Sequence, residues 1–188
     1  MSDRRAWLQG LAFLSTSRRP HDLCAVLAGT VVGWPGLTPF PIDQAPSCLG
    51  AEIASGWLQF GTEYVPYRVF RLASEDSHTW LLLWNGVVHL VELFALPKSV
   101  TVESISSQLT PPREEIELPA AARMQRRLLD PDETATELVF PHRGLAILVG
   151  RKSPEQARIV RLRAFEPMSL EQYVQQYVWL APIRFLSP

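Results

Sequence analysis

This chain of 188 residues has no excess of basic over acidic side chains. The 18 basic and 19 acidic residues leave a net charge of −1 at pH 7, and the balance does not drift along the chain. A protein that binds nucleic acid by neutralising phosphates carries a basic excess on at least one face. We therefore expect no nucleic-acid partner.

Cysteine is rare, with Cys24 and Cys48 as the only two residues of this type. Neither belongs to the C-x-x-C spacing of a metal site, and two thiols can form at most one disulfide. The sequence leaves the redox state of this pair open. It predicts no bound metal.

The first twenty residues, MSDRRAWLQGLAFLSTSRRP, lack the pattern expected of a secretory signal. The apolar run after Arg4 and Arg5 is interrupted by Gln9, and no small-residue cleavage site follows it. The sequence therefore predicts a cytoplasmic protein.

The motifs of common enzyme classes are missing as well. There is no G-x-S-x-G, no H-E-x-x-H and no dinucleotide-binding fingerprint. The stretch GLAILVGRKS, which begins at Gly144, has five residues between its glycines and the pattern of a strand, so it is not a phosphate-binding loop. His21 and Cys24 lie one helical turn apart but lack a third ligand or catalytic partner. We expect no catalytic residue and no cofactor, and the sequence favours a protein that is not an enzyme.

The stretch WLLLWNGVVHLVELFAL, from Trp80 to Leu96, is the most apolar part of the chain. A spanning helix needs about 20 apolar residues, whereas Asn85 and Gly86 interrupt this one. Asn-Gly between apolar runs is a strong signal for a two-residue hairpin turn, because both residues accept a positive φ. The sequence therefore predicts two antiparallel strands, at 78–84 and 87–95, and no membrane span.

The turn also predicts the register of this hairpin, in which Leu82 pairs with His89 and Trp80 pairs with Val91. Strict alternation then places four side chains on one face as a candidate ligand pocket, namely Trp80, Leu82, Trp84 and His89. The alternative for His89 is a histidine satisfied within the core. Alternation places Glu92 on the opposite face, so His89 and Glu92 cannot act on one reacting atom.

The rest of the pattern predicts an α+β fold with an antiparallel sheet in a single domain, 1–188. Ser169 and Gln172 have the spacing of a capping box at the start of the last helix. A Pro/Gly-rich loop is expected at 34–50 and a polar linker at 97–118, and the apolar run at 22–33 fits a helix or a buried strand. The further strands are expected at 56–61, 65–72, 135–140, 144–150 and 157–165, and the helices near 3–15, 119–129 and 169–180.

The tryptophans outside the hairpin are candidate interface residues, because tryptophan is enriched at protein–protein interfaces. Four of them, Trp7, Trp34, Trp57 and Trp179, lie mostly at the ends of expected elements. The alternative is that they simply pack the core. The sequence favours a non-enzymatic binding or assembly protein, adaptor-like or chaperone-like, whose partner is another protein or a second copy of the chain. The alternative is a protein that binds a small apolar ligand or a chromophore in the pocket at Trp80 and His89.

The last ten residues, WLAPIRFLSP, are unusually apolar. Their interface candidates are Trp179, Ile183, Phe185 and Leu186. A free tail of this composition exposes an apolar patch that soluble monomers rarely tolerate. We expect it to dock on its own sheet as an edge strand, with binding to another chain as the alternative.

Overall fold

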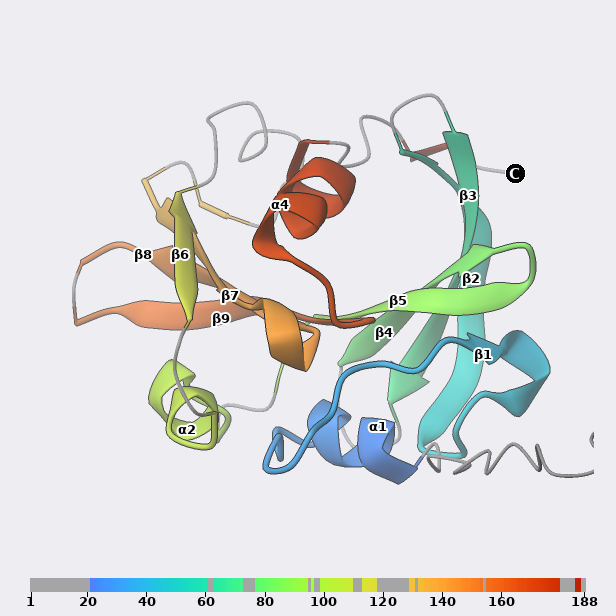
Figure 1. Cartoon of the computed structure of the whole chain (residues 1–188), viewed down its shortest axis with the longest axis horizontal. Helices are drawn as coiled ribbons and strands as arrows, with labels where there is room; N and C mark the ends of the chain where they lie inside the picture. The colour runs from blue at the N-terminus through green and yellow to red at the C-terminus, as the bar shows by residue number, and fades with distance from the viewer. Residues whose placement is uncertain are drawn as a thin grey trace, which may run out of the picture.

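Two four-stranded meanders lie side by side in one sheet in the computed structural model (Figure 1). The structure describes residues 21–60, 63–72, 77–94, 96, 99–109, 113–117, 129–130, 132–153, 155–179 and 185–186. The first meander consists of β2 (Leu49–Phe60), β3 (Glu63–Leu72), β4 (His78–Trp84) and β5 (Val87–Phe94). The second consists of β6 (Glu114–Glu117), β7 (Thr134–Phe140), β8 (Leu145–Arg151) and β9 (Ala157–Phe165). Their last strands, β5 and β9, pair with each other and so join the two halves.

Two very short strands complete this sheet among the described residues. β1 (Phe40–Pro41) pairs with β5, and β10 (Phe185–Leu186) pairs with β2 at the sheet edge. The resulting order is β10-β2-β3-β4-β5-β9-β8-β7-β6, and every neighbouring pair is antiparallel. The described helices are few and short, so the fold is dominated by its sheet and the α+β description applies only loosely.

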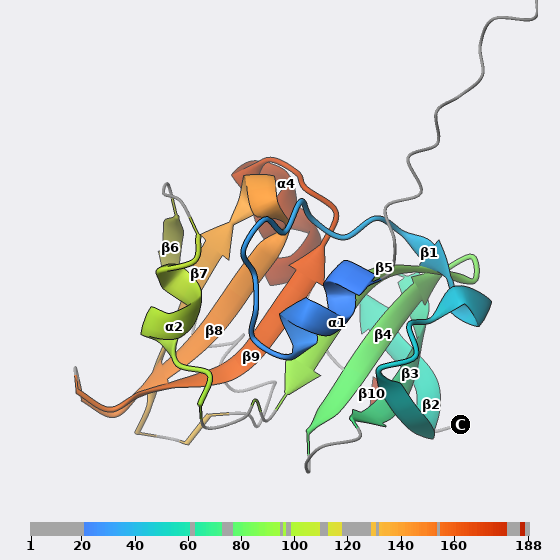
Figure 2. The same cartoon turned by 90° about the horizontal axis from the view of Figure 1, so that it is seen from below.

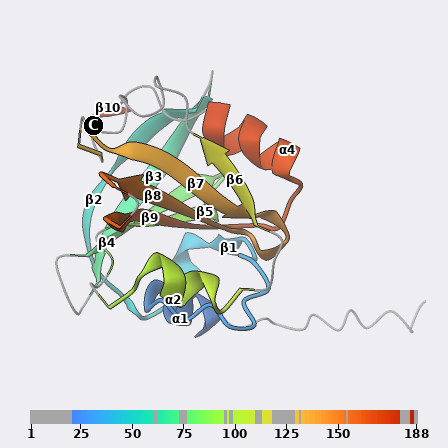
Figure 3. The same cartoon turned by 90° about the vertical axis from the view of Figure 1, so that its left-hand side faces the viewer.

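Helices cover both faces of the sheet, as Figure 3 shows. On one face lie α1 (His21–Leu27) and α2 (Val102–Ser106). On the other lies α4 (Leu170–Tyr173), which continues into the π-helical segment η3 (Val174–Trp179). Two 3-10 turns, η1 (Ile42–Gln44) and η2 (Pro141–Arg143), belong to the connections.

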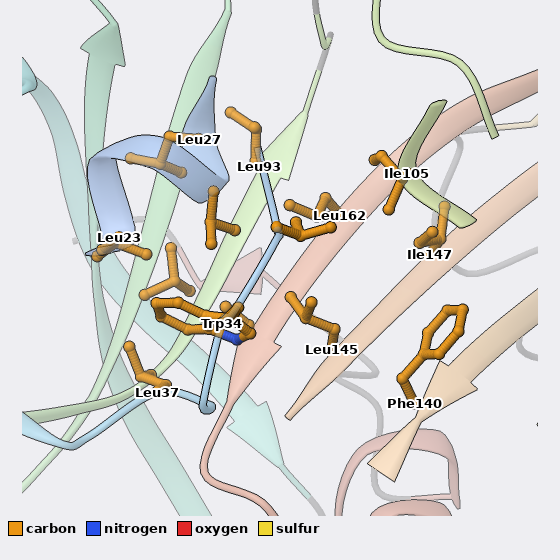
Figure 4. Packing of buried hydrophobic residues seen from close by; sticks show 14 of the residues in the cluster. Leu23, Leu27, Trp34, Leu37, Leu93, Ile105, Phe140, Leu145, Ile147 and Leu162 are labelled. Carbon is orange, nitrogen blue, oxygen red and sulfur yellow. The ribbon is translucent and has the colours of Figure 1, made fainter. Parts of the chain in front are cut away.

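The face under α1 and α2 holds the larger hydrophobic cluster, which we call the α1 core. Trp34, from the loop after α1, is only 4% exposed and lies among Leu23, Leu37 and Leu145 (Figure 4). Its backbone carbonyl oxygen accepts a hydrogen bond of 3.1 Å from Nη1 of Arg143. Full burial of a leucine or isoleucine side chain contributes about 1.5–3 kcal/mol, so this cluster is a main source of stability. Trp34 is therefore a core residue.

The opposite cluster, which we call the α4 core, packs α4 and η3 against both meanders. Tyr173 and Tyr177 lie against Phe165 of β9, with ring centroids 4.8 and 5.8 Å away. The predicted capping box starts α4: the side chain of Ser169 accepts from the backbone of Gln172, and the side chain of Gln172 accepts from the backbone of Ser169. The sequence therefore predicted this helix start correctly.

The central hairpin has the predicted turn, with positive φ values of 53° at Asn85 and 78° at Gly86. Among the described residues, no helix has the length and apolar character needed to cross a membrane. The predicted register holds for two pairs and then fails, because His89 is the extra residue of a β-bulge. Leu82 pairs with Leu90 instead of His89, and Trp80 pairs with Glu92 instead of Val91. A bulge opposes two residues to one, which strict alternation does not anticipate.

Several other expectations can be compared with the described elements. The strands expected at 135–140, 144–150 and 157–165 match β7, β8 and β9 closely, and the run at 22–33 begins with α1. The stretch 97–118, expected as a linker, includes α2 and β6, and the loop 34–50 includes β1, η1 and the start of β2. The helix expected at 3–15 and nearly all of the one at 119–129 lie outside the described residues.

The C-terminal strand forms as an edge strand, as expected from its extended apolar sequence. Phe185 pairs with Leu58 and Leu186 with Trp57, through the backbone of β2. Ile183 lies outside the described residues, and Trp179 ends η3. Backbone pairing within the monomer agrees with the docked tail, while the use of these residues as an interface stays a prediction.

A disulfide between Cys24 and Cys48 ties α1 to the residue before β2. It closes a loop with a sequence separation of 24 residues. Cross-linking a loop of this length restricts the unfolded chain and stabilises the folded state by about 3 kcal/mol. The disulfide therefore supports the packing of α1 on the sheet.

We predict that the double variant Cys24→Ser/Cys48→Ser loses about 3 kcal/mol of unfolding free energy, measured by urea denaturation. A reductant should lower the stability of the wild-type protein to that of the variant and leave the variant unchanged. Equal stability of wild type and variant without reductant contradicts a disulfide in the native protein.

Candidate functional site

The four residues predicted to form a ligand pocket share the α4 face of the sheet, but they do not line the open groove described below. Leu82 is fully buried in the α4 core. Trp80 stacks on Tyr67 with ring centroids 4.7 Å apart, and Trp84 meets the ring of His89 edge-on at 5.9 Å. These aromatic rings are therefore packed against one another at the surface of the α4 core.

The bulge at His89 changes the position of Glu92. Alternation along a regular strand assigns Glu92 to the face opposite Trp80, whereas the bulge pairs the two residues directly and places them on one face. Glu92 is also the cross-strand partner of Arg163 in β9. The prediction that Glu92 points away from the Trp80 face was therefore wrong.

Four charged side chains meet beneath α4, and we call them the buried charge cluster: Glu92, Glu137, Arg161 and Arg163. Oε1 of Glu92 accepts hydrogen bonds from Nη1 of Arg161 at 3.0 Å and from Nη2 of Arg163 at 2.6 Å. Nη2 of Arg161 donates to Glu137. Two guanidinium groups and two carboxylates give the cluster no formal net charge. Burial of so many charges is tolerated only because each has an oppositely charged partner.

The cluster reaches from the sheet to the helix that covers it. Nη1 of Arg163 donates to the hydroxyl oxygen of Tyr173 at 2.9 Å, and to the carbonyl oxygen of Tyr177 at 3.5 Å. The guanidinium carbon lies 5.8 and 5.5 Å from the centroids of the two tyrosine rings, within the range of a cation–π contact. Arg163 therefore connects β9 to both α4 and η3.

Burial also decides the protonation of the two tyrosines. It raises the pKa of the Tyr173 hydroxyl well above its ordinary value and raises the pKa of Tyr177 to about 12, although the nearby Arg163 opposes both shifts. Both hydroxyls are therefore neutral at pH 7. A neutral Tyr173 can accept from Arg163 and still donate its own proton.

The buried charge cluster has the character of a structural connection. Glu137, Arg161 and Arg163 are each 1% exposed, so the cluster offers no open position for a substrate. Across the part of the chain that the structure describes, no three His, Cys, Asp or Glu side chains are grouped so that they could hold a metal ion. The arrangement can fix α4 and η3 on the sheet.

An open groove of about 440 Å³ lies elsewhere, beside the edge strand β2. The groove is bounded by β2, β3, η1 and the tip of the β4–β5 hairpin, whose side-by-side positions are visible in Figure 2. Its lining is mixed, with an exposed ion pair of 3.1 Å between Arg68 and Glu52. The apolar side chains along it are Ile42, Trp57, Pro66 and Leu83. An open groove with apolar walls and a neutral ion pair is suited to binding.

Three exposed apolar side chains lie on the two strands that border the groove, and one of them, Trp57, lines it. Ile53 is 48%, Trp57 49% and Tyr64 54% exposed, and all three belong to β2 or β3. Exposed aromatic side chains next to a groove mark a surface suited to protein contacts. We call these three residues, together with the groove, the β2 surface.

Sequence reasoning anticipated this surface only in part. Trp57 was singled out among the tryptophans outside the hairpin, and its exposure agrees with a role at an interface. The pair of Arg68 and Glu52 was missed, because their contact joins strands through a register that the local sequence does not reveal. The buried charge cluster was missed too, although Arg161 and Arg163 in a central strand, with Glu137 in another, are the signal that could have pointed to it.

We predict that Glu137→Gln destabilises the protein by about 3 kcal/mol, because Glu92 is then the only carboxylate beside two buried guanidinium groups, and one positive charge of the cluster stays uncompensated. The matched control is Glu52→Gln, which removes the same charge from an exposed pair and should change stability by less than about 1 kcal/mol. Urea denaturation measures both. Similar losses in the two variants contradict the structural importance of the cluster.

The raised pKa of Tyr177 predicts a loss of stability at high pH. A hydroxyl with a pKa near 12 in the folded protein and about 10 in the unfolded chain binds its proton more tightly when folded. Its contribution is complete below pH 10 and disappears as the pH rises from 10 to 12. Urea denaturation of the wild type and of Tyr177→Phe between pH 10 and 12 should show that the free energy of unfolding falls more steeply in the wild type. Equal slopes of this free energy against pH contradict the prediction.

Comparisons with protein-family models, with curated protein sequences and with solved structures find no match to this chain.

Proposed function

We propose that this chain is a non-enzymatic binding or assembly protein, of adaptor or chaperone-like type, and that it recognises another protein through the β2 surface. The observation that carries this proposal is the half-exposed Trp57, which lines the open groove, with exposed Ile53 and Tyr64 on the same two strands. Aromatic side chains are enriched at interfaces and supply most of the binding energy where they become buried.

A protein partner suits this surface better than a small ligand. Drug-sized ligands favour concave sites that bury most of their area, whereas this groove is partly open to solvent. The alternative, a small apolar ligand or chromophore at Trp80, Leu82, Trp84 and His89, competes with the mutual stacking of those aromatic rings. The β2 surface is free of that competition.

The cytoplasmic location expected from the sequence stays a prediction, and the Cys24–Cys48 disulfide bears on it. Disulfides persist in oxidising compartments and are rare in the reducing cytoplasm. An oxidised pair in protein isolated with its thiols blocked argues for an oxidising compartment. A reduced pair argues for the cytoplasm.

We test the proposed function by site-specific photo-crosslinking in the native host, with p-benzoylphenylalanine at one position in each variant. Ile53 and Tyr64 are replaced to probe the β2 surface. Val32 is the matched control, because it is 70% exposed and apolar but lies in the loop after α1. We expect crosslinks to a second polypeptide from positions 53 and 64 and none from 32. Crosslinks from no position, or equally from all three, contradict the proposal.

A further inference from the structure

We infer that the partner binds as an extended polypeptide segment that adds a strand to the open part of β2 and places one apolar side chain in the adjacent groove. This inference rests on the proposed function and names the form in which the partner is recognised. It follows from the backbone of β2, from the position of the groove, and from the strand that already pairs with the same edge.

Among the described residues, the edge of β2 is open along most of its length. β10 pairs only with Trp57 and Leu58, and the residues of 49–56 that pair with a described strand pair with β3. Residues 51–55 are all exposed. Backbone N–H and C=O groups along such an edge are a template for another strand. The chemistry that satisfies them is that of a polypeptide backbone.

The opposite edge of the sheet provides a contrast. β6 has four residues, of which Glu114, Glu115 and Glu117 are glutamates, and short length and charge both discourage strand pairing. β2 has twelve residues, and Glu52 is the only charged side chain among them. That charge is balanced by Arg68. Two register shifts bend β2 and oppose strand pairing, but its length and low charge make it the more suitable of the two edges.

The groove supplies specificity next to this edge. Glu52, Ser55 and Trp57 of β2 all line it, so a strand added beside them directs alternate side chains toward it. The walls at Ile42, Pro66 and Leu83 suit an aliphatic or aromatic side chain. Strand addition commonly takes affinity from backbone hydrogen bonds and specificity from pockets for alternate side chains.

β10 shows that β2 accepts an extended segment at this edge. Its pairs, Phe185 with Leu58 and Leu186 with Trp57, are antiparallel, and the open part of β2 continues directly from them. A partner segment along residues 49–56 therefore extends the same line of strands.

A flexible segment suits this edge better than a second copy of the chain. Register shifts between Leu49 and Glu52, and again between Glu52 and Ala54, bend β2 along its open part. Two rigid copies must match these irregularities to each other, whereas an unfolded peptide can adapt its backbone to them. The occupant is therefore an extended peptide with a bulky apolar residue.

The probe is a nonapeptide selected from a random display library on the full-length, oxidised protein and then synthesised. We expect the selected peptide to carry a bulky apolar residue and to slow hydrogen exchange at amides of residues 49–56. Trp57→Ala should weaken its binding at least about tenfold, while Val32→Ala leaves it unchanged. Circular dichroism confirms that both variants are folded.

Backbone methylation of the peptide separates strand addition from other binding and needs no protein variant. Methyl groups on alternate amides that point toward β2 should weaken binding at least about tenfold, and methyl groups on the intervening amides should have little effect. Equal effects of the two patterns, protection away from β2, or no enriched peptide overturn the inference. Crosslinks from positions 53 and 64 with equal methylation effects leave the proposed function standing and remove strand addition alone.

Discussion

Glu92 accepts hydrogen bonds from Arg161 and Arg163 at the point where the two meanders meet, and the arrangement of the α4 side depends on this contact. Glu92 belongs to β5 and the two arginines belong to β9, so the contact reinforces the pairing that joins the halves of the sheet. Arg161 continues to Glu137 in β7, and Arg163 continues to Tyr173 in α4. One carboxylate thus connects both meanders and the covering helix. Removal of either partner leaves a charge without compensation in a buried environment, so the parts are coupled.

The β-bulge at His89 is what makes this contact possible. Beyond the bulge, Leu90 and Glu92 face the α4 core, while Val91 and Leu93 face the α1 core. A hairpin without the extra residue reverses these faces and directs the carboxylate into the cluster of aliphatic side chains under α1. The partners of this carboxylate, Arg161 and Arg163, contact it on the α4 side. The cost of an unpaired buried charge therefore favours the bulged register over the regular one.

The sequence predicted features that depend on residues close together in the chain, and it missed most features that depend on residues far apart. The Asn85-Gly86 turn, the capping box at Ser169 and the strand β9 depend on neighbouring residues, and each was predicted. The bulge depends on the match between Glu92 and two arginines about 70 residues later, so no local pattern contains it. The α2 helix was missed because five residues are too few for a clear helical period, although its capping contacts at Thr101 and Ser104 are local. The groove was missed because η1, β2, β3 and the hairpin tip meet only in the folded chain.

The buried charge cluster and the β2 surface lie in different parts of the same sheet. The cluster lies on β5, β7 and β9, where every charged side chain has a partner inside the protein. The β2 surface lies at the far edge of the first meander, where the ion pair of Arg68 and Glu52 is exposed and weakly stabilising. Two strands, β3 and β4, separate β2 from β5 in the sheet. A partner bound at the proposed β2 surface would meet none of the four residues of the buried charge cluster, since none of them lines the groove. Pairing with β3 already holds β2 extended, and such preorganisation would lower the entropic cost of the proposed binding.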